Sequence, residues 1–248
     1  MILSRISKAI REQNWFAVAI EFVIVVLGVV IGFQISAWNE QRGEASREQA
    51  YIGFLIEDFE ADHAEFSAIR RTAEGRNAVL HLVLTEATGE PPSDRFVSPE
   101  GEILLPAAGR AELPDDLSLI YSITFLRTID GNRHAYTSLV STGDNRIIAD
   151  SALIRDIQRF YAEVDEFRDL EATILNNRDN MMNSLRALGI SRQTPIEVGA
   201  LAAQVREHPA LRAQMQDFYL YSLRQGERVR EFEDRSGALV TRLREAAP

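Results

Sequence analysis

Residues 15–38 read WFAVAIEFVIVVLGVVIGFQISAW and form the most apolar stretch of the chain. A helix of this length, rising about 1.5 Å per residue, spans about 35 Å, which is enough for a bilayer core of about 30 Å. Trp15 and Trp38 stand at its ends, where tryptophan rings anchor a helix at the two membrane interfaces. A core helix of a globular protein is the alternative, but residues 22–33 carry no polar side chain. We therefore predict a transmembrane helix over residues 16–38.

The apolar run is expected to remain in the mature protein as an anchor. It is longer than the apolar part of a signal peptide, which has about 7–15 residues, and it begins late in the chain. The only alanine that resembles a cleavage point is Ala37, and the bulky Ile35 occupies the −3 position, where a small residue is preferred. We therefore predict an uncleaved anchor.

The distribution of basic residues around the helix predicts its orientation. Residues 1–15 form a short basic lead-in, either an amphipathic helix on the inner leaflet or a frayed segment. The positive-inside rule places the more basic flank in the cytoplasm. It predicts a single-pass protein of the bacterial inner membrane, with a cytoplasmic N-terminus and a periplasmic domain over residues 39–248. The basic residues before the helix are Arg5, Lys8 and Arg11, and those after it are Arg42 and Arg47.

One face of the predicted helix is suited to contact with another helix. At about 100° per residue, Glu21, Gly28, Gly32 and Asn39 fall within about 20° of one line, and Ser36 adds a further small residue nearby. Small residues allow helix backbones to approach closely, and a carboxylate inside a membrane is normally buried or paired. Alternatively, Glu21 reaches water at the interface and the glycines are incidental. The expected partner is either a second copy or another membrane protein.

Composition excludes several classes of function. The net charge is −10, and residues 1–39 contribute +1, so the rest of the chain carries −11. An acidic domain repels phosphate backbones, which argues against a nucleic-acid partner. The chain has no cysteine, which excludes disulfides, thiolate metal sites and cysteine nucleophiles. Lys8 is the only lysine, so lysine Schiff-base chemistry is excluded from residues 39–248.

The pattern of residues 39–248 predicts a mainly α fold. Apolar residues recur at helical spacing from residue 40 to about 85, so the transmembrane helix is expected to continue outward as a stalk. Residues 88–116 are rich in proline and glycine and predict a loop, with a short hairpin around residues 102–105. Asp115 or Asp116 is then expected to cap a helix over residues 117–128.

The C-terminal half predicts further helices. A turn at residues 143–145 precedes a long helix capped by Asp150 or Ser151, and a break at residues 189–195 follows it. A short helix and a last long helix, beginning after Pro209 and ending near Arg244, complete the chain. The predicted architecture is an antiparallel helical bundle on a stalk.

Two stretches resemble a known family. The run EFVIVVLGVVIGFQISAWNE, residues 21–40, is similar to the signature of an uncharacterised bacterial family of N-terminally anchored single-pass membrane proteins, a domain of unknown function. The second stretch is AYTSLVSTGDN, residues 135–145, followed by a helix that contains Phe160 and Tyr161. The resemblance implies the anchor and a helical fold, and it implies no activity.

The most chemical-looking clusters do not complete a catalytic or metal motif. Glu60 and His63 have the Glu-x-x-His spacing that di-iron bundles use on two helices, but no other histidine has a glutamate three residues before it. We interpret residues 57–66 as a solvated acidic face beside packed phenylalanines. His134 lies near Asp130, Tyr136 and Ser141, but no G-x-S-x-G elbow accompanies them. We therefore expect no cofactor, no metal and no catalytic residue.

Three functions compete on this sequence. The leading hypothesis is a membrane-anchored interaction or scaffold protein, or an accessory subunit of a membrane complex, that associates through the transmembrane helix. The second is a periplasmic helical module that binds or senses a ligand. An enzyme comes third, because no phosphate-binding loop, H-E-x-x-H motif or nucleotide fingerprint is present.

Overall fold

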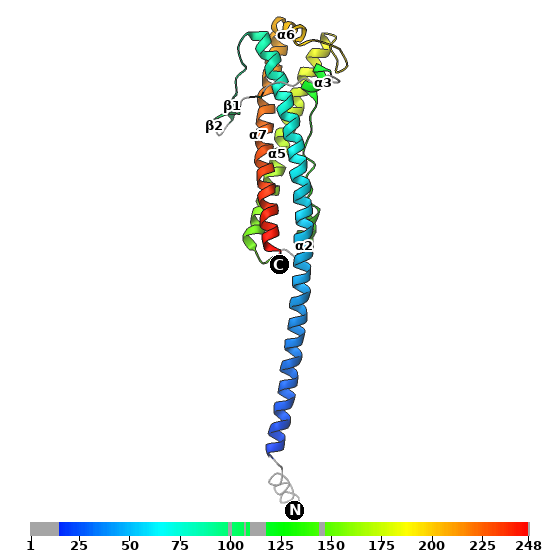
Figure 1. Ribbon diagram of the computed structural model, residues 1–248, viewed down its shortest axis with the longest axis vertical. Helices are drawn as coiled ribbons and strands as arrows, with labels where there is room; N and C mark the ends of the chain where they lie inside the picture. The colour runs from blue at the N-terminus through cyan, green and yellow to red at the C-terminus, as the bar shows by residue number, and fades with distance from the viewer. Residues whose placement is uncertain (1–14, 99–100, 107, 110–117, 144–146, 248) are drawn as a thin grey trace, which may run out of the picture. The chain divides into compact units, whose positions relative to one another are not determined.

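The computed structural model describes residues 15–98, 101–106, 108–109, 118–143 and 147–247. The predicted lead-in lies outside these residues, apart from the backbone of Trp15. The chain divides into two compact units, Met1–Ala50 and Tyr51–Pro248, which are described separately below. Within the described residues the structure consists of helices and one two-stranded sheet, which confirms the mainly α prediction (Figure 1).

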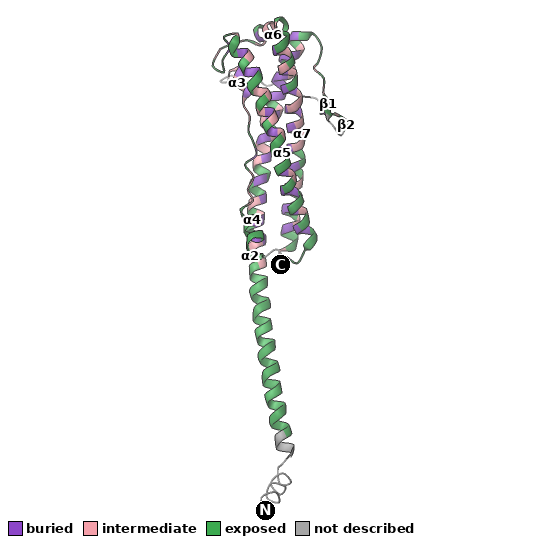
Figure 2. Ribbon diagram, turned by 180° about the vertical axis from the view of Figure 1, so that it is seen from behind, coloured by how far each residue is buried: buried purple, intermediate pink, exposed green. Residues whose placement is uncertain are grey.

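The first unit contains the N-terminal part of α2, a helix that extends over Trp15–Thr88. No proline occurs in this range, and Gly43 does not interrupt the helix, so the helix continues past the predicted transmembrane segment as expected. Every side chain described between residues 19 and 47 is exposed, as Figure 2 shows in green. This part of α2 is long and apolar enough to cross a membrane.

Three long helices form the second unit. They are the part of α2 from residue 51 onward, α5 over Ser151–Ala187 and α7 over Pro209–Ala246. Figure 1 shows that α7 runs antiparallel to the other two helices, whereas α2 and α5 run in the same direction. The two helices can run in the same direction because the chain returns along the length of the bundle after α2 and before α5. Residues 125–133 make this return, and we call them the connecting segment.

The core of this unit follows a regular 3-4 spacing on each long helix. On α2 every position of the series is buried from Ile52 to Ala87, and two of these positions are polar, Asp62 and Arg76. Such a spacing keeps one stripe facing the neighbouring helices. An aromatic cluster fills one part of the core, with ring centroids 5.3–6.0 Å apart. Its members are Phe59, Phe66, Phe160, Phe167 and Phe232.

The predicted loop contains a hairpin, but it begins earlier than the one expected around residues 102–105. β1, Arg95–Ser98, pairs antiparallel with β2, Gly101–Leu104, and Phe96 lies opposite Ile103. Helix α3 covers Leu119–Thr124 and is shorter than the helix predicted over residues 117–128. Ser118 caps it by accepting a hydrogen bond from the backbone N–H of Tyr121, and the two aspartates predicted to cap it lie outside the described residues.

The remaining elements match the predicted breaks. Helix α4 covers His134–Ser141, and Gly143 follows it with a φ of +75°; the rest of the predicted turn lies outside the described residues. Asp150 caps α5, because its carboxylate accepts the backbone N–H groups of Ala152 and Leu153, both at 2.9 Å. Gly189, with a φ of +75°, terminates α5. Helix α6, Val198–Glu207, leads directly into α7.

Candidate functional site

The structure places the predicted association residues on exposed helix surface. Glu21, Gly28, Gly32, Ser36 and Asn39, which we call the membrane face, all lie on the exposed part of α2. A Cβ atom added at either glycine would meet nothing within 4 Å. The described part of this chain therefore leaves open space above both glycines, as the close approach of a second helix requires.

One of the two predicted interface anchors is described. The Trp38 side chain is 57% exposed, and the Arg42 guanidinium lies 4.6 Å from the centre of its ring. A cation over a tryptophan face is a favourable electrostatic contact. This pair combines an apolar ring with a charged group, which suits the boundary between hydrocarbon and water. The side chain of Trp15 lies outside the described residues.

The residues of the Glu-x-x-His pattern have structural partners. Glu60 forms an ion pair with Arg244 at 2.5 Å, and Nδ1 of His63 lies 2.9 Å from the carbonyl oxygen of Glu233. Gly237 packs beside His63, and a Cβ there would lie at an ordinary contact distance of 3.6 Å from the imidazole. Within the described residues no group of three metal-binding side chains comes together.

The residues around the predicted Ser-Gly turn also have local roles. The Ser141 hydroxyl donates to the carbonyl oxygen of Ser138 at 3.0 Å, at the end of α4. Tyr136 stacks on Tyr161, with ring centroids 5.1 Å apart, and His134 is exposed at the start of α4. Among the described contacts, none links this histidine to the serine.

The interpretation of residues 57–66 as a solvated acidic face is wrong in one respect. Glu57 and Glu60 are exposed, but Asp62 is completely buried. Asp62 occupies a core position of the 3-4 spacing, between Phe59 and Phe66. That position in the spacing is the signal by which the sequence could have revealed its burial.

Asp62 and its neighbours bind backbone groups. We call Asp58, Asp62 and Glu65 the acidic stripe. Oδ1 of Asp62 accepts the backbone N–H of Asn132 at 2.7 Å, and Oδ2 of Asp58 accepts that of Ala135 at 2.7 Å. Glu65 accepts the two backbone N–H groups of residues 130 and 131, at 2.7 and 3.2 Å. The acidic stripe therefore holds the connecting segment and the start of α4 by their backbone donors.

Burial changes the ionisation of Asp62 and of its phenolic neighbour. Burial raises the pKa of Asp62 to about 6, although the hydrogen bonds from Asn132 oppose the shift. The Tyr161 hydroxyl donates to the carbonyl oxygen of Asn132 at 2.9 Å. Burial raises the pKa of Tyr161 well above its ordinary value, and the charge of Asp62 adds to the rise. Tyr161 therefore remains a neutral hydrogen-bond donor.

The second polar core position on α2 belongs to a larger network. We call Arg76, Glu171, Ser222 and Gln225 the polar layer. The Arg76 guanidinium donates to Ser222 Oγ and to Gln225 Oε1, both at 2.7 Å. Its third bond, at 3.0 Å, goes to the carbonyl oxygen of Phe125 in the connecting segment. Burial lowers the pKa of Arg76 to about 9, assisted by the nearby positive charge of Arg178.

The polar layer connects a buried cation to a buried acid through an amide. Gln225 accepts from Arg76 and donates to Glu171 Oε1 at 3.4 Å and to the carbonyl oxygen of Arg127 at 3.2 Å. Glu171 accepts the backbone N–H of Ile129 at 3.1 Å. Burial raises the pKa of Glu171 to about 7. The network joins all three long helices to the connecting segment, and its hydrogen bonds hold the backbone of that segment in place.

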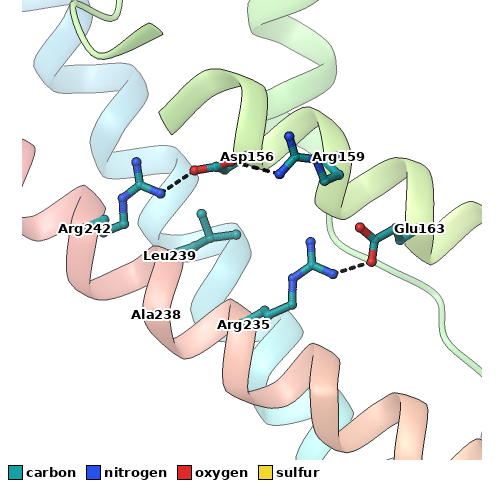
Figure 3. Close-up of a pocket in the computed structure, with 7 residues that line it drawn as sticks. All are labelled: Asp156, Arg159, Glu163, Arg235, Ala238, Leu239 and Arg242. Carbon is teal, nitrogen blue, oxygen red and sulfur yellow. Dashed lines mark hydrogen bonds and ion pairs between the residues drawn. The ribbon is translucent and has the colours of Figure 1, made fainter. Parts of the chain in front are cut away.

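An open groove between α5 and α7 presents charged side chains to solvent (Figure 3). Its volume is about 450 Å³, and Ala238 and Leu239 lie among its lining residues. Two ion pairs cross it, Arg242 with Asp156 at 2.6 Å and Arg235 with Glu163. The guanidinium of Arg242 lowers the pKa of Asp156. Such a groove could hold a small ligand, since its volume lies within the usual range for ligand sites.

No protein-family model matches the chain, and neither a curated protein nor a solved structure matches it. The resemblance of residues 21–40 and 135–145 to a bacterial family of anchored proteins therefore stays a prediction.

Proposed function

We propose that this chain is a membrane-anchored interaction protein, acting as a scaffold or as an accessory subunit of a membrane complex. It associates through the membrane face of α2, either with a second copy or with another membrane protein. The observation that carries the proposal is the open space above Gly28 and Gly32 on a helix that is apolar and exposed over a membrane's thickness. The proposal assigns the chain no catalytic activity and no cofactor.

Two physical arguments support association through this face. Lipid tails are as apolar as leucine side chains, so helices associate in membranes through close packing and polar contacts. Gly28 and Gly32 permit the packing. Glu21 supplies a polar group whose burial in lipid alone is costly, and a partner helix lowers that cost.

The proposed location is the bacterial inner membrane, with residues 39–248 in the periplasm. The support is the excess of basic residues before the helix over those that follow it. Trp38 and Arg42 are then expected to lie at the periplasmic interface, where the ring and the guanidinium suit a boundary between hydrocarbon and water.

The proposal is tested by extraction of the tagged full-length protein from its native membranes with a mild detergent. The mass of the complex and the identity of its chains are measured for the wild type and for the variants Glu21→Leu and Gly28→Ile. Two matched controls change similar residues away from the membrane face, Gln34→Leu and Ala37→Ile. We expect both test variants to release the partner while both controls retain it.

The composition of the complex then distinguishes two forms of the function. A different chain at constant stoichiometry identifies an accessory subunit, and a complex of this chain alone identifies a self-associating scaffold. Association through the membrane face is refuted when all four variants retain the wild-type complex, or when the controls lose it as readily as the test variants do.

The groove between α5 and α7 favours a second candidate function, a periplasmic ligand-binding module. This function is compatible with the first, because the groove lies in the second unit and the membrane face in the first.

A further inference from the structure

The groove between α5 and α7 has a gap in the middle of its pattern of ion pairs. Residues 156, 159 and 163 of α5 lie along one side, and residues 235, 238, 239 and 242 of α7 along the other (Figure 3). The antiparallel arrangement pairs Asp156 with Arg242 and Glu163 with Arg235. Between the two pairs the remaining α5 residue is Arg159, and α7 offers only Ala238 and Leu239. No acidic side chain of α7 among the lining residues is therefore left for Arg159.

Of the three arginines in the groove, Arg159 has the weakest ion pair. Its side chain is 67% exposed, and its contact with Asp156 is long, at 3.5 Å. Asp156 also accepts a hydrogen bond from Arg242 at 2.6 Å. Arg159 therefore shares this carboxylate with an arginine that lies closer to it. A guanidinium has five N–H donors in a planar fork. Most donors of Arg159 are therefore available for a ligand.

The charge of the groove contrasts with that of the chain. Three arginines and two carboxylates line it, whereas the whole chain has a net charge of −10. Arg242 has a second acidic partner outside the lining, Asp150 at 3.6 Å, so the positive charge that attracts an anion is that of the Arg159 guanidinium. Leu239, at the base, is buried to 6% exposure, and Ala238 beside it is small. The hollow therefore combines a cationic wall with a small apolar floor.

We propose that the groove binds a phosphate-bearing ligand through Arg159, Arg235 and Arg242, with the organic part of the ligand over Ala238 and Leu239. A ligand with a single carboxylate would have no advantage over Asp156 and Glu163, which already pair with Arg242 and Arg235 through the same group. A phosphate group carries more charge and more acceptor oxygens, and it accepts bidentate hydrogen bonds from guanidinium groups. It can bind Arg159 and also compete with the two carboxylates for their arginines.

Two sources share this chemistry, a soluble phosphate ester and the headgroup of an anionic phospholipid. Binding is measured first by calorimetry on the full-length protein in a non-ionic detergent, titrated with glycerol phosphate and with inorganic phosphate. Sodium chloride at matched ionic strength is the reference. We expect saturable binding of both phosphates and none of chloride, with glycerol phosphate the tighter because it also covers the apolar floor.

Two variants test the groove by independent means. Arg159→Gln removes the guanidinium with the weakest ion pair, and we expect it to weaken phosphate binding by at least about tenfold. Ala238→Leu fills the hollow without changing its charge, and we expect it to weaken glycerol phosphate by a similar factor. Arg155→Gln is the matched control, since Arg155 is an exposed arginine of α5 outside the groove lining. Thermal unfolding followed by circular dichroism verifies that all three variants fold.

The proposal is overturned when neither phosphate binds at millimolar concentration, or when Arg155→Gln weakens binding as much as Arg159→Gln does. It is overturned also when Arg159→Gln and Ala238→Leu both bind as the wild type. The source is then determined in nanodiscs that contain phosphatidylglycerol or phosphatidylcholine. Loss of glycerol phosphate binding only with phosphatidylglycerol identifies the lipid headgroup, and retained binding identifies a soluble ester; either result supports the phosphate site.

Discussion

Helix α2 carries two polar stripes whose surroundings differ. In the first unit, the membrane face is exposed along its length, and a side chain added at Gly28 or Gly32 would meet nothing. In the second unit, the acidic stripe is bound by backbone N–H groups of residues 130–135. The same helix therefore presents one polar stripe that its own chain covers and another that the described part of its chain leaves uncovered.

The comparison shows how polar groups on an apolar helix are stabilised. A buried carboxylate is stable only when hydrogen-bond donors surround it, and the connecting segment brings such donors to Asp62 and Glu65. The carboxylates in turn accept hydrogen bonds from the backbone of the connecting segment, which has no strand partner among the residues that the structure describes. In the proposed membrane location, Glu21 has the same requirement. A partner helix would meet this requirement at the membrane face, as the proposed function requires.

The largest expected effect follows from removing the centre of the acidic stripe. Asp62→Leu leaves the backbone N–H of Asn132 without an acceptor in a buried place, and we expect the free energy of unfolding to fall by about 3 kcal/mol. The measurement is chemical denaturation of the full-length protein in detergent, followed by circular dichroism. Glu60→Leu is the control, because this exposed residue has only a surface ion pair, worth less than about 1 kcal/mol. Equal losses for the two variants would contradict the role assigned to Asp62.

The sequence predicts the helices better than it predicts what joins them. The 3.6-residue periodicity, the Asp150 cap and the break at Gly189 are local features, and the structure confirms them. The local pattern assigns Asp62 to a solvated face, where polar residues usually lie, and it makes no assignment for Arg76, yet both side chains are buried. In this chain their places in the 3-4 spacing of buried positions carry the information.

The connecting segment and the groove could not be predicted from local pattern. The connecting segment is extended because side chains from three helices bind its backbone, and those contacts are distant in sequence. The groove depends on how α5 and α7 pair, since only that pairing sets Arg159 opposite Ala238. The membrane face, in contrast, could be predicted from local pattern. Its residues follow from helical geometry alone, and the structure confirms the helix while its partner stays a prediction.

The next effect, of comparable size, is the pH dependence of the stability of the second unit. Burial raises the pKa of Asp62 to about 6 and that of Glu171 to about 7. The folded state therefore binds more protons than the unfolded state between about pH 4 and pH 7, so stability rises as the pH falls through this window. From pH 7 to pH 5 we expect the free energy of unfolding to increase by about 3 kcal/mol.

The same denaturation experiment, repeated across pH, checks this expectation. Below about pH 4 stability is expected to fall, because Arg133 lowers the pKa of Asp165 and that ion pair is lost on protonation. The double variant Asp62→Asn with Glu171→Gln should flatten the rise between pH 7 and pH 5. A wild-type protein that loses stability steadily from pH 7 downward would show that these two carboxylates are not the controlling groups.

A smaller effect compares two serines, one in the polar layer and one on the membrane face. Ser222 accepts from Arg76 and donates to Asn77, and it is completely buried. Ser222→Ala leaves both partners short of a hydrogen bond, and we expect a loss of about 1–2 kcal/mol in the free energy of unfolding. Ser36→Ala, on exposed helix, should change it by less than about 0.5 kcal/mol. A loss at Ser36 as large as that at Ser222 would mean that the membrane face is already covered, by the chain itself or by a partner helix.

The smallest effects come from replacing two glycines by alanine. The change at Gly237 is expected to stabilise the fold, whereas the change at Gly28 is expected to weaken the complex with the partner helix. A Cβ at Gly237 of α7 would lie at an ordinary contact distance of 3.6 Å from His63, so Gly237→Ala gains helix propensity without a clash. We expect it to raise the free energy of unfolding by about 0.5–1 kcal/mol. Gly28→Ala gains the same propensity, yet its added methyl occupies space that the proposed partner helix requires. It should therefore weaken the detergent-extracted complex while Gly237→Ala leaves that complex intact. A complex that is equally stable in both variants would show that no partner helix packs closely against Gly28.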